Sequence, residues 1–522
     1  QEVSTLDPAF MWDDFGFALV PATHDTLVAY KKVGGVEGGV VLPNLAEELL
    51  PPTDEGRTYS YTLRPGLKYS DGSAVQASDV RRSFERLFLA DSTSSVFYGA
   101  IKGADGCSPK RCDLSQGIVT ENRTRSVVFH LQRAVPDFPY HLAHPMSGLV
   151  PPGTAPKDLG ITRVPGTGPY AVTTAEGDAD SGRAVLERNP HFHSRGAVQP
   201  EGYPDRIVVT WGGDPIDRVA AVKAGSEDWT IDAQQEGVDA VRLAIEVPAQ
   251  LHVFEQQGVF FATLNPNIAP LDDVRVRRAI NFAVDRRAMA GHVGAPLLAG
   301  VTCQVLAKNL FGYQPYCPYT KDPAPSGTWT APDLATARRL VRESGTQGQR
   351  ITIWTPPFEF FERPATVIAD ALRLLDYRST VRVIRDFEGF SGLASDAKDF
   401  QILLLGWIVD YPAPSSFIMP VLMCPGSFNE FAGLPDASAN VANFCSPEID
   451  KMTLRALDVQ ENDTLRSSDL WTAIDRALTD AAPWVPFATR RVATLVSSRV
   501  GNVLFNPTTG PLITQMWLTD RK

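Results

Sequence analysis

The sequence predicts a protein of the α/β class, in which strands and amphipathic helices follow one another along the chain. Tyr59, Tyr61 and Leu63 alternate with polar residues, which is the pattern of a half-buried strand. The next periodic segment, residues 79–89, predicts a helix with Ser78 as its N-cap. Its apolar residues fall on one helical face: Val80, Phe84, Leu87 and Phe88.

Helix boundaries further along the chain carry clear signals. Asp214 is a good N-cap, Pro215 suits the first helical position, and Gly225 suits the position after the last turn. Ser446 and Pro447 repeat the same start signal. The sequence therefore predicts one helix from 215 to about 224 and another that begins at 447.

Length and charge narrow the class of protein. The 522 residues allow roughly three or four domains' worth of core. A net charge of -11 argues against nucleic acid or an anionic membrane as the main partner. No stretch approaches about eighteen consecutive apolar residues, so no segment is predicted to span a bilayer. No signal peptide is present at Gln1, and we interpret the sequence as processed.

The six cysteines form three local pairs in loop-like segments. The pairs are Cys107 with Cys112, Cys303 with Cys317, and Cys424 with Cys445. This arrangement favours disulfides and an oxidising compartment, and zinc is the alternative. Closing a loop of about 15 residues adds about 3 kcal/mol in the chain-entropy model.

The stretch 402–412 contains the most informative acid. Its apolar run predicts a short buried strand that ends in Gly406 and Trp407. Asp410 follows among apolar neighbours, where an unpaired carboxylate costs several kcal/mol. Two interpretations fit equally well at this point: Asp410 caps a turn before Pro412, or it waits for the positive charge of a ligand.

Several sequence segments occur in a fixed order along the chain. The first segments lie between Leu45 and Phe84, and include Tyr-x-Tyr-x-Leu-Arg-Pro-Gly and Ser-Asp-Gly. Others follow over nearly the whole chain: Gly166-Thr167-Gly168-Pro169-Tyr170, Leu186 to Pro190, Leu271 to Ile280 with Asp285 and Arg286, and Trp484 to Phe487. In their order and spacing these segments resemble the family 5 extracellular solute-binding proteins, the peptide- and nickel-binding components of ABC importers.

The resemblance implies a two-lobed, periplasmic-binding-protein-like fold of the large type, with an extra subdomain inserted in the first lobe. By analogy the first lobe comprises 1–40, 166–261 and 481–522, the inserted subdomain 41–165, and the second lobe 262–480. The two chain crossings are expected near Gln257–Leu264 and Trp484–Thr489.

The resemblance also implies a binding site. In the oligopeptide and dipeptide binders, a Gly-Trp-x-x-Asp segment of the second lobe holds the peptide's α-amino group through its Asp. Gly406, Trp407, Asp410 and Tyr411 match that segment. Arg363 lies where dipeptide binders carry an arginine at the start of a helix, with a surface ion pair to Glu359 or Glu362 as its alternative role.

Two aromatic residues complete the expected ligand-binding set. Phe10 and Trp12, in the opening segment, are candidates for the wall of the first lobe that faces the ligand, with core packing as the alternative.

An enzyme, a metal carrier and a sugar carrier are the alternative functions, and each would require its own sequence motifs. The sequence has no Gly-x-Ser-x-Gly elbow, His-Glu-x-x-His or phosphate loop, although a carboxylate pair of a hydrolase stays open. A metal carrier would use His191 with His193 or His141 with His144, for which packing or a surface loop is the alternative. A sugar carrier would use aromatic platforms, and no set of aromatic residues stands out.

We therefore expect the extracellular binding component of an ABC importer, which captures a peptide between two lobes. An oligosaccharide, metal chelate or other solute is the alternative ligand. The resemblance implies no catalysis and no cofactor. It implies a monomer that meets an ABC permease and its ATPase, held on the outer face of the cytoplasmic membrane by a lipid anchor outside this sequence.

Overall fold

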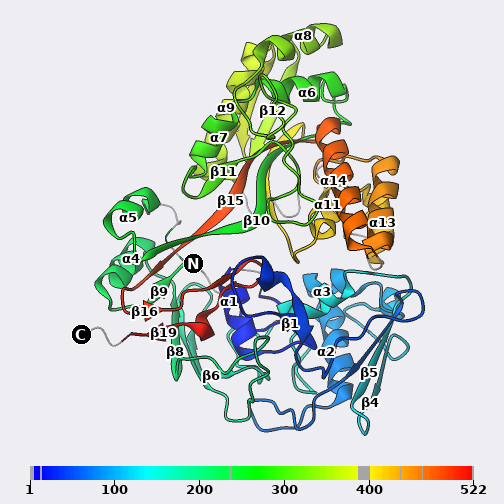
Figure 1. Ribbon diagram of the computed structural model, residues 1–522, viewed down its shortest axis with the longest axis vertical. Coiled ribbons are helices and arrows are strands. Elements are labelled where there is room, and N and C mark those ends of the chain that lie inside the picture. The colour runs from blue at the N-terminus through cyan, green and yellow to red at the C-terminus, as the bar shows by residue number, and fades with distance from the viewer. Residues whose placement is uncertain are drawn as a thin grey trace. The chain divides into compact units, whose positions relative to one another are not determined.

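The computed structural model describes residues 5–11, 14–231, 233, 238–385, 400–434, 437–460 and 463–519. The chain divides into two compact units (Figure 1). The first comprises Gln1–Phe254, Phe431–Leu434 and Ala493–Lys522, and the second Glu255–Glu430 and Pro435–Val492. The chain enters the second unit within strand β10 (Leu251–Leu264) and leaves it within strand β15 (Trp484–Val496). The inserted subdomain at 41–165 and the exact lobe boundaries stay predictions.

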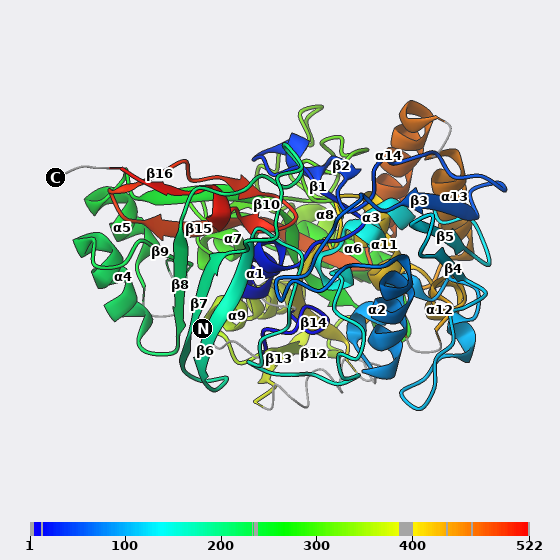
Figure 2. The ribbon, with the colours of Figure 1, turned by 90° about the horizontal axis from the view of Figure 1, so that it is seen from below.

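The first unit contains two three-stranded antiparallel sheets. Tyr59 and Tyr61 of β3 are buried, which confirms the alternating strand. One sheet has β3 (Thr58–Thr62), β5 (Ser126–His130) and β4 (Ile118–Glu121), and the other has β6 (Tyr170–Gly177), β7 (Gly182–Arg188) and β8 (Arg206–Trp211), which lie side by side in Figure 2.

Shorter elements complete the first unit. They are α1 (Asp14–Thr23), β1 (Val28–Tyr30), β2 (Val41–Pro43), α2 (Ala77–Leu89), α3 (Phe138–Ala143), α4 (Pro215–Ala224), β9 (Trp229–Thr230), α5 (Ala240–Glu246), β16 (Val500–Gly501), β17 (Phe505–Asn506), β18 (Gly510–Pro511) and β19 (Trp517–Leu518). Single 3-10 turns lie at Val36–Gly39, Thr93–Tyr98, Ala104–Gly106, Pro145–Ser147 and Ile513–Gln515.

Helix starts show which local signals were sufficient. Helix α4 begins at Pro215, with the Asp214 carboxylate accepting the Ile216 amide at 2.8 Å, as predicted. The prediction of Ser78 as an N-cap was wrong, because α2 begins at Ala77 with Gln76 as its N-cap. The Asp79 carboxylate accepts the Gln76 amide at 2.9 Å, and the N-cap thereby lies two residues earlier than expected.

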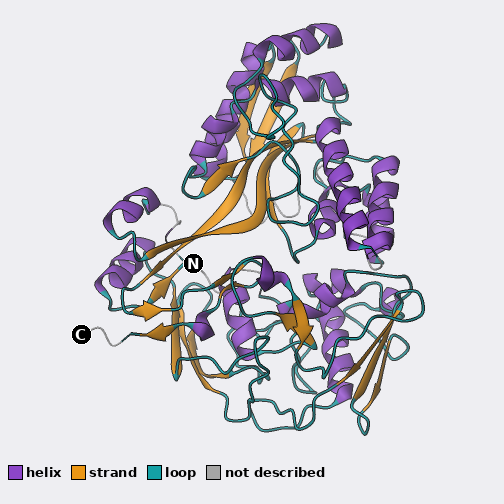
Figure 3. Cartoon of the chain, in the orientation of Figure 1, coloured by secondary structure: helices purple, strands orange, loops and turns teal. Residues whose placement is uncertain are grey.

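The second unit is built on a mixed sheet with the order β11-β15-β10-β14-β12-β13, and β9 pairs with the far end of β15. Figure 3 shows these strands with helices around them. The remaining strands are β11 (Ala299–Val301), β12 (Arg350–Thr355), β13 (Arg378–Val383) and β14 (Ile402–Ile408). The helices are α6 (Val274–Ala283), α7 (Arg286–His292), α8 (Leu334–Ser344), α9 (Glu359–Leu374), α11 (Pro414–Leu422), α12 (Pro425–Ala432), α13 (Pro447–Gln460) and α14 (Thr464–Ala481).

The two faces of this sheet are both covered. Ile402 and Leu404 of β14 lie in a large core with Val276 of α6 and Ile368 of α9. Leu403, which points to the opposite face, lies in a smaller cluster with Val441. Burial on both faces explains why the sequence shows a continuous apolar run here and no alternation. Within the described residues, no helix combines the length and apolarity needed to cross a membrane.

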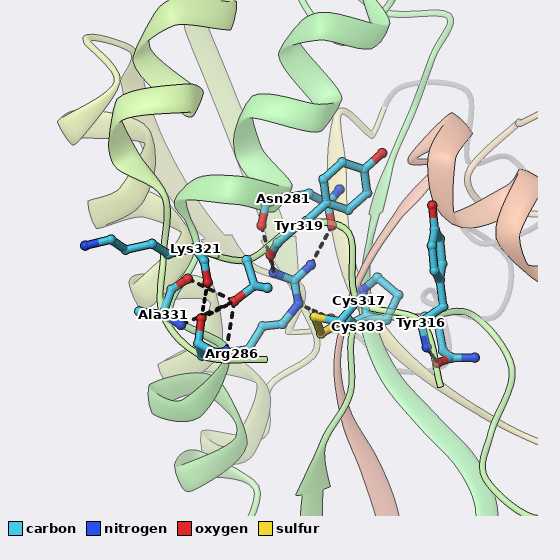
Figure 4. Close-up of a disulfide and its surroundings, with 12 residues drawn as sticks. Asn281, Arg286, Cys303, Tyr316, Cys317, Tyr319, Lys321 and Ala331 are labelled. Atoms are coloured by element: carbon cyan, nitrogen blue, oxygen red, sulfur yellow. Dashed lines mark hydrogen bonds between the residues drawn. A yellow bond between two sulfur atoms is a disulfide. The ribbon is translucent and has the colours of Figure 1, made fainter. Parts of the chain in front are cut away.

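All three predicted disulfides are present: Cys107–Cys112, Cys303–Cys317 and Cys424–Cys445. Beside the second of them lies the fully buried Arg286, whose guanidinium donates to the backbone oxygen of Pro486 at 2.8 Å and to the Asn281 side chain at 2.7 Å (Figure 4). Burial lowers the pKa of Arg286 to about 9. This cation fastens the junction of α6 and α7 to β15.

Three histidines of the first unit are buried: His24, His141 and His144. The rings of His141 and His144 lie 5.4 and 5.0 Å from the Phe97 ring, in agreement with a packing role. Burial lowers the pKa of His24 to about 4 and the pKa values of His141 and His144 to about 3. The folded protein therefore holds these imidazoles neutral where an unfolded chain protonates them.

We expect the free energy of unfolding to fall as the pH is lowered from about 6.5 towards 4. Below pH 6.5 the histidines of the unfolded chain bind protons, whereas the buried histidines of the folded protein stay neutral. Each such histidine lowers the free energy of unfolding by up to about 1.4 kcal/mol per pH unit. Urea midpoints at pH 7 and pH 5 measure this loss. His144→Leu should show a smaller loss than the wild type, and an equal loss would contradict the assignment.

Candidate ligand-binding site

Strand β14 is paired unequally along its two edges. On one edge its antiparallel register with β10 runs from Ile402 to Ile408. On the other edge its parallel register with β12 covers only Ile402 and Leu403. Among the described residues, no strand pairs with this second edge beyond Leu403. Beyond Leu403 this edge of β14, up to Ile408 at the end of the strand, therefore has no partner strand in the described chain.

The direction of the peptide groups on this edge follows from the antiparallel pattern. The Val409 amide donates to the Gln257 backbone oxygen at 3.0 Å, towards β10. Peptide groups alternate between the two sides of a strand, so those of Trp407 also point to β10. The N–H and C=O of Gly406 and Ile408 then point to the unpaired edge. Each of these N–H groups needs an acceptor, and each of these C=O groups needs a donor.

Gly406 is the most exposed residue of β14 and lies opposite Phe260 of β10. A Cβ atom at Gly406 would approach the Phe260 ring to 3.0 Å, closer than ordinary van der Waals contact. The glycine thus allows the phenyl ring to lie against the strand, and it leaves the surface beside the unpaired edge without a side chain.

Trp407 and Tyr411 are both fastened to the start of α11. The Trp407 indole donates to the Ser416 backbone oxygen at 3.3 Å. The Ser416 hydroxyl accepts the amides of Asp410 at 2.8 Å and Tyr411 at 3.3 Å. Ser416 was not predicted, because nothing in the sequence distinguishes a serine six residues after the acid. A ligand contact of Trp407, half-buried, or of Tyr411, buried, stays a prediction.

Asp410 lies directly after β14, at the end of the unpaired edge, and is half-buried. Burial raises the pKa of its carboxyl group to about 7, and hydrogen bonding by Ser416 and by its own amide opposes this rise. No cation pairs with Asp410 among the described residues. The turn is held by the Ser416 hydroxyl, and the acid is left poised between its neutral and charged forms.

Arg363 lies in α9, which follows the carboxyl end of β12. The ends of parallel strands are the usual binding side of an α/β sheet. The Arg363 guanidinium donates to Glu359 at 2.7 Å, and both side chains are exposed. This is the alternative role that the sequence allowed, and binding of a ligand carboxylate by Arg363 stays a prediction.

The remaining candidates lie in the first unit. Phe10 is half-buried and packs against the core that contains Tyr59 and Phe84. Trp12 lies outside the described residues. His191 and His193 lie in a loop after β7, and no cluster of three metal-binding side chains occurs in the part of the chain that the structure describes.

A cavity of about 700 Å³ lies in the first unit between β8, β9 and the β16–β19 pair. Its walls include Trp211, Trp229 and Trp517. None of the predicted ligand-binding residues that the structure describes lines it. Because Gly406, Trp407 and Asp410 lie at the end of β14, we take that end, and not this cavity, as the candidate site.

Comparison with known proteins identifies the class. Residues 40–429 match the bacterial extracellular solute-binding proteins, family 5 middle, and the chain belongs to this family. The family consists of substrate-binding proteins of ABC transporters and not of enzymes.

Individual relatives agree with this assignment. The glutathione-binding protein GsiB of Salmonella typhi is 22% identical over 97% of this chain and 91% of its own length. A clavulanic acid biosynthesis oligopeptide binding protein matches with a TM-score of 0.84 at 24% identity, over 100% of this chain and 94% of that one. DppA from Helicobacter pylori, in complex with the peptide STSA, matches with a TM-score of 0.74 at 19% identity, over 99% and 96%. These likenesses confirm the predicted two-lobed fold.

We expect Asp410→Asn to stabilise the ligand-free protein at pH 7 to 8 and to have little effect at pH 4. A carboxyl group whose pKa is raised on folding contributes stability below its unfolded pKa of 3.8, and that contribution is lost as the pH rises towards about 7. For a partly exposed group we expect a gain of about 1–2 kcal/mol. Urea unfolding at both pH values measures it, and destabilisation at pH 8 would contradict the assignment.

Proposed function

We propose that this protein binds peptides outside the cell and delivers them to an ABC importer. The observation that carries the proposal is the unpaired edge of β14, which ends at a carboxylate without a cationic partner among the described residues. An extended peptide has backbone groups that can pair with the free edge of β14. It also has one terminal ammonium that can pair with the Asp410 carboxylate.

In the proposed complex the peptide lies along β14 as an added strand. The peptide groups of Gly406 and Ile408 exchange hydrogen bonds with the peptide backbone, which does not depend on the ligand's side chains. The peptide ammonium meets Asp410 in a charge-assisted hydrogen bond, worth about 1.5–3 kcal/mol. The ammonium favours the carboxylate form, so binding lowers the pKa of Asp410 and releases a proton below pH 7.

The relatives support a ligand with these groups. GsiB is named for glutathione and DppA was solved with a peptide. A dipeptide binding protein from Pseudoalteromonas in complex with Met-Leu also matches, with a TM-score of 0.74 at 18% identity. All three ligands carry an amino group, amide bonds and a carboxylate.

The family is extracellular, and its members serve ABC transporters. On that basis we propose a permease and a separate ATPase as partners of this protein. We also propose that it acts as a monomer and that a lipid anchor outside the given sequence holds it at the outer face of the cytoplasmic membrane.

We expect Asp410→Asn to weaken peptide binding by roughly ten- to hundredfold, because the charge-assisted bond is lost. The wild type should also bind more weakly as the pH falls below about 7, where Asp410 is protonated, by up to about tenfold per pH unit. Asp410→Asn should lose this dependence. Titration calorimetry with a tetra-alanine peptide from pH 5 to 8 measures both effects.

The matched control is Asp370→Asn on α9, an exposed acid that pairs with Arg373. It should leave peptide affinity and its pH dependence unchanged. Unaltered peptide affinity in Asp410→Asn, with the fold intact, would contradict the proposal that Asp410 binds the peptide ammonium.

Arg363 makes a separate prediction. If it holds the ligand carboxylate, a dipeptide amide should bind the wild type about tenfold more weakly than the free acid, because one charge-assisted bond is missing. Arg363→Gln should bind both forms alike, whereas Arg373→Gln, on the same helix, should keep the difference. The same ratio in all three proteins would show that Arg363 serves only its ion pair with Glu359.

A further inference from the structure

Three phenylalanines form an aromatic surface beside Gly406, here called the phenylalanine shelf: Phe260, Phe358 and Phe360. The rings of Phe358 and Phe360 stack with centroids 5.5 Å apart, and Phe260 lies 6.4 Å from Phe360. Phe361 packs behind the shelf, 5.9 Å from Phe260, and is buried. Phe360 is 42% exposed, although the burial of a phenyl ring is strongly favourable.

The position of the shelf follows from the order of the elements. Strand β12 ends at Thr355, and its register with β14 has already ended at Leu403. The chain then turns through Phe358 into α9, which begins at Glu359. The shelf therefore lies at the carboxyl ends of β12 and β14, next to the stretch of β14 that has no partner strand in the described chain.

Gly406 and Phe260 set the face on which the shelf lies. They are directly opposite in the β10–β14 register, so their side-chain directions share one face of the sheet. The added Cβ at Gly406 points at the Phe260 ring. An apolar group on this face above Gly406 would thus meet the shelf, with Leu404 and Ile408 as its neighbours on β14.

The strand register predicts which ligand residue reaches this point, given the added strand proposed above. The Asp410 carboxylate and its hydrogen bond to the ammonium together span about two strand residues, at about 3.4 Å each. The first ligand residue then lies opposite Ile408. In an antiparallel ladder the third ligand residue lies opposite Gly406 and directs its side chain to the same face, and the second directs its side chain to the Trp407 face.

We propose that the phenylalanine shelf is a specificity site for the third side chain of a bound peptide, and that it selects an apolar, above all an aromatic, side chain there. This inference rests on the proposed function and concerns the peptides of three or more residues among its ligands. The absence of a side chain at Gly406 provides the room for a large side chain in the added strand. Contacts between aromatic rings add to the gain from burial, which favours aromatic over aliphatic residues.

The test compares three peptides of equal length: Ala-Ala-Phe-Ala, Ala-Phe-Ala-Ala and tetra-alanine. Calorimetry with the wild type should show about tenfold tighter binding of Ala-Ala-Phe-Ala than of tetra-alanine. Phe360→Ala should lose most of the gain from phenylalanine at position three and keep any gain at position two. The matched control is Leu374→Ala, at the other end of α9, where the side chain is 49% exposed. It should retain both gains.

The outcomes separate this inference from the proposed function. Equal gains at position three in the wild type and Phe360→Ala would overturn the shelf, while Asp410-dependent binding of tetra-alanine would keep the proposed function. A uniform loss for all three peptides in Phe360→Ala would show a structural role and would also overturn the shelf. Failure of every peptide to bind the wild type would overturn both proposals.

Discussion

The unequal pairing of β14 is the constraint on which the site depends. Its antiparallel partner β10 accompanies it along its whole length, whereas its parallel partner β12 departs after Leu403. The strand is thereby held rigidly on one side and keeps peptide groups available on the other. A binding strand of this kind needs both properties, since an unsupported edge would lose order and a fully paired strand would offer nothing to a ligand.

The carboxyl group of Asp410, at the end of this strand, loses hydration without gaining a cation as a partner among the described residues. Burial raises the pKa of Asp410, and Ser416 uses its hydroxyl for the backbone of the turn. Strongly shifted pKa values are frequent at functional sites, and the hydrogen bonds from Ser416 and from its own amide offset only part of the shift at Asp410. The rest of the second unit is built more firmly. Arg286, which is buried and donates a hydrogen bond to an oxygen from each of its three side-chain nitrogens, joins α6 and α7 to β15 beside the Cys303–Cys317 disulfide.

Much of the fold could be predicted because its signals are local. The cap at Asp214, the alternation in β3 and the three disulfides each depend on residues close in the sequence. The prediction failed at Ser78 because the carboxylate of the next residue, Asp79, accepts the Gln76 amide and the helix starts two residues earlier. A choice between such neighbours depends on packing that a single sequence does not display.

The sequence by itself determined the Gly-Trp-x-x-Asp segment, the buried strand before it and the family to which these residues point. Only the tertiary structure decided that β12 departs at Leu403, that Phe260 lies opposite Gly406, that Ser416 holds the turn and that Arg363 pairs with Glu359. The physical reason is strand register. Residues more than a hundred positions apart, such as Phe260 and Gly406, are brought together by the burial of two sheet faces at once, and no local propensity encodes that alignment.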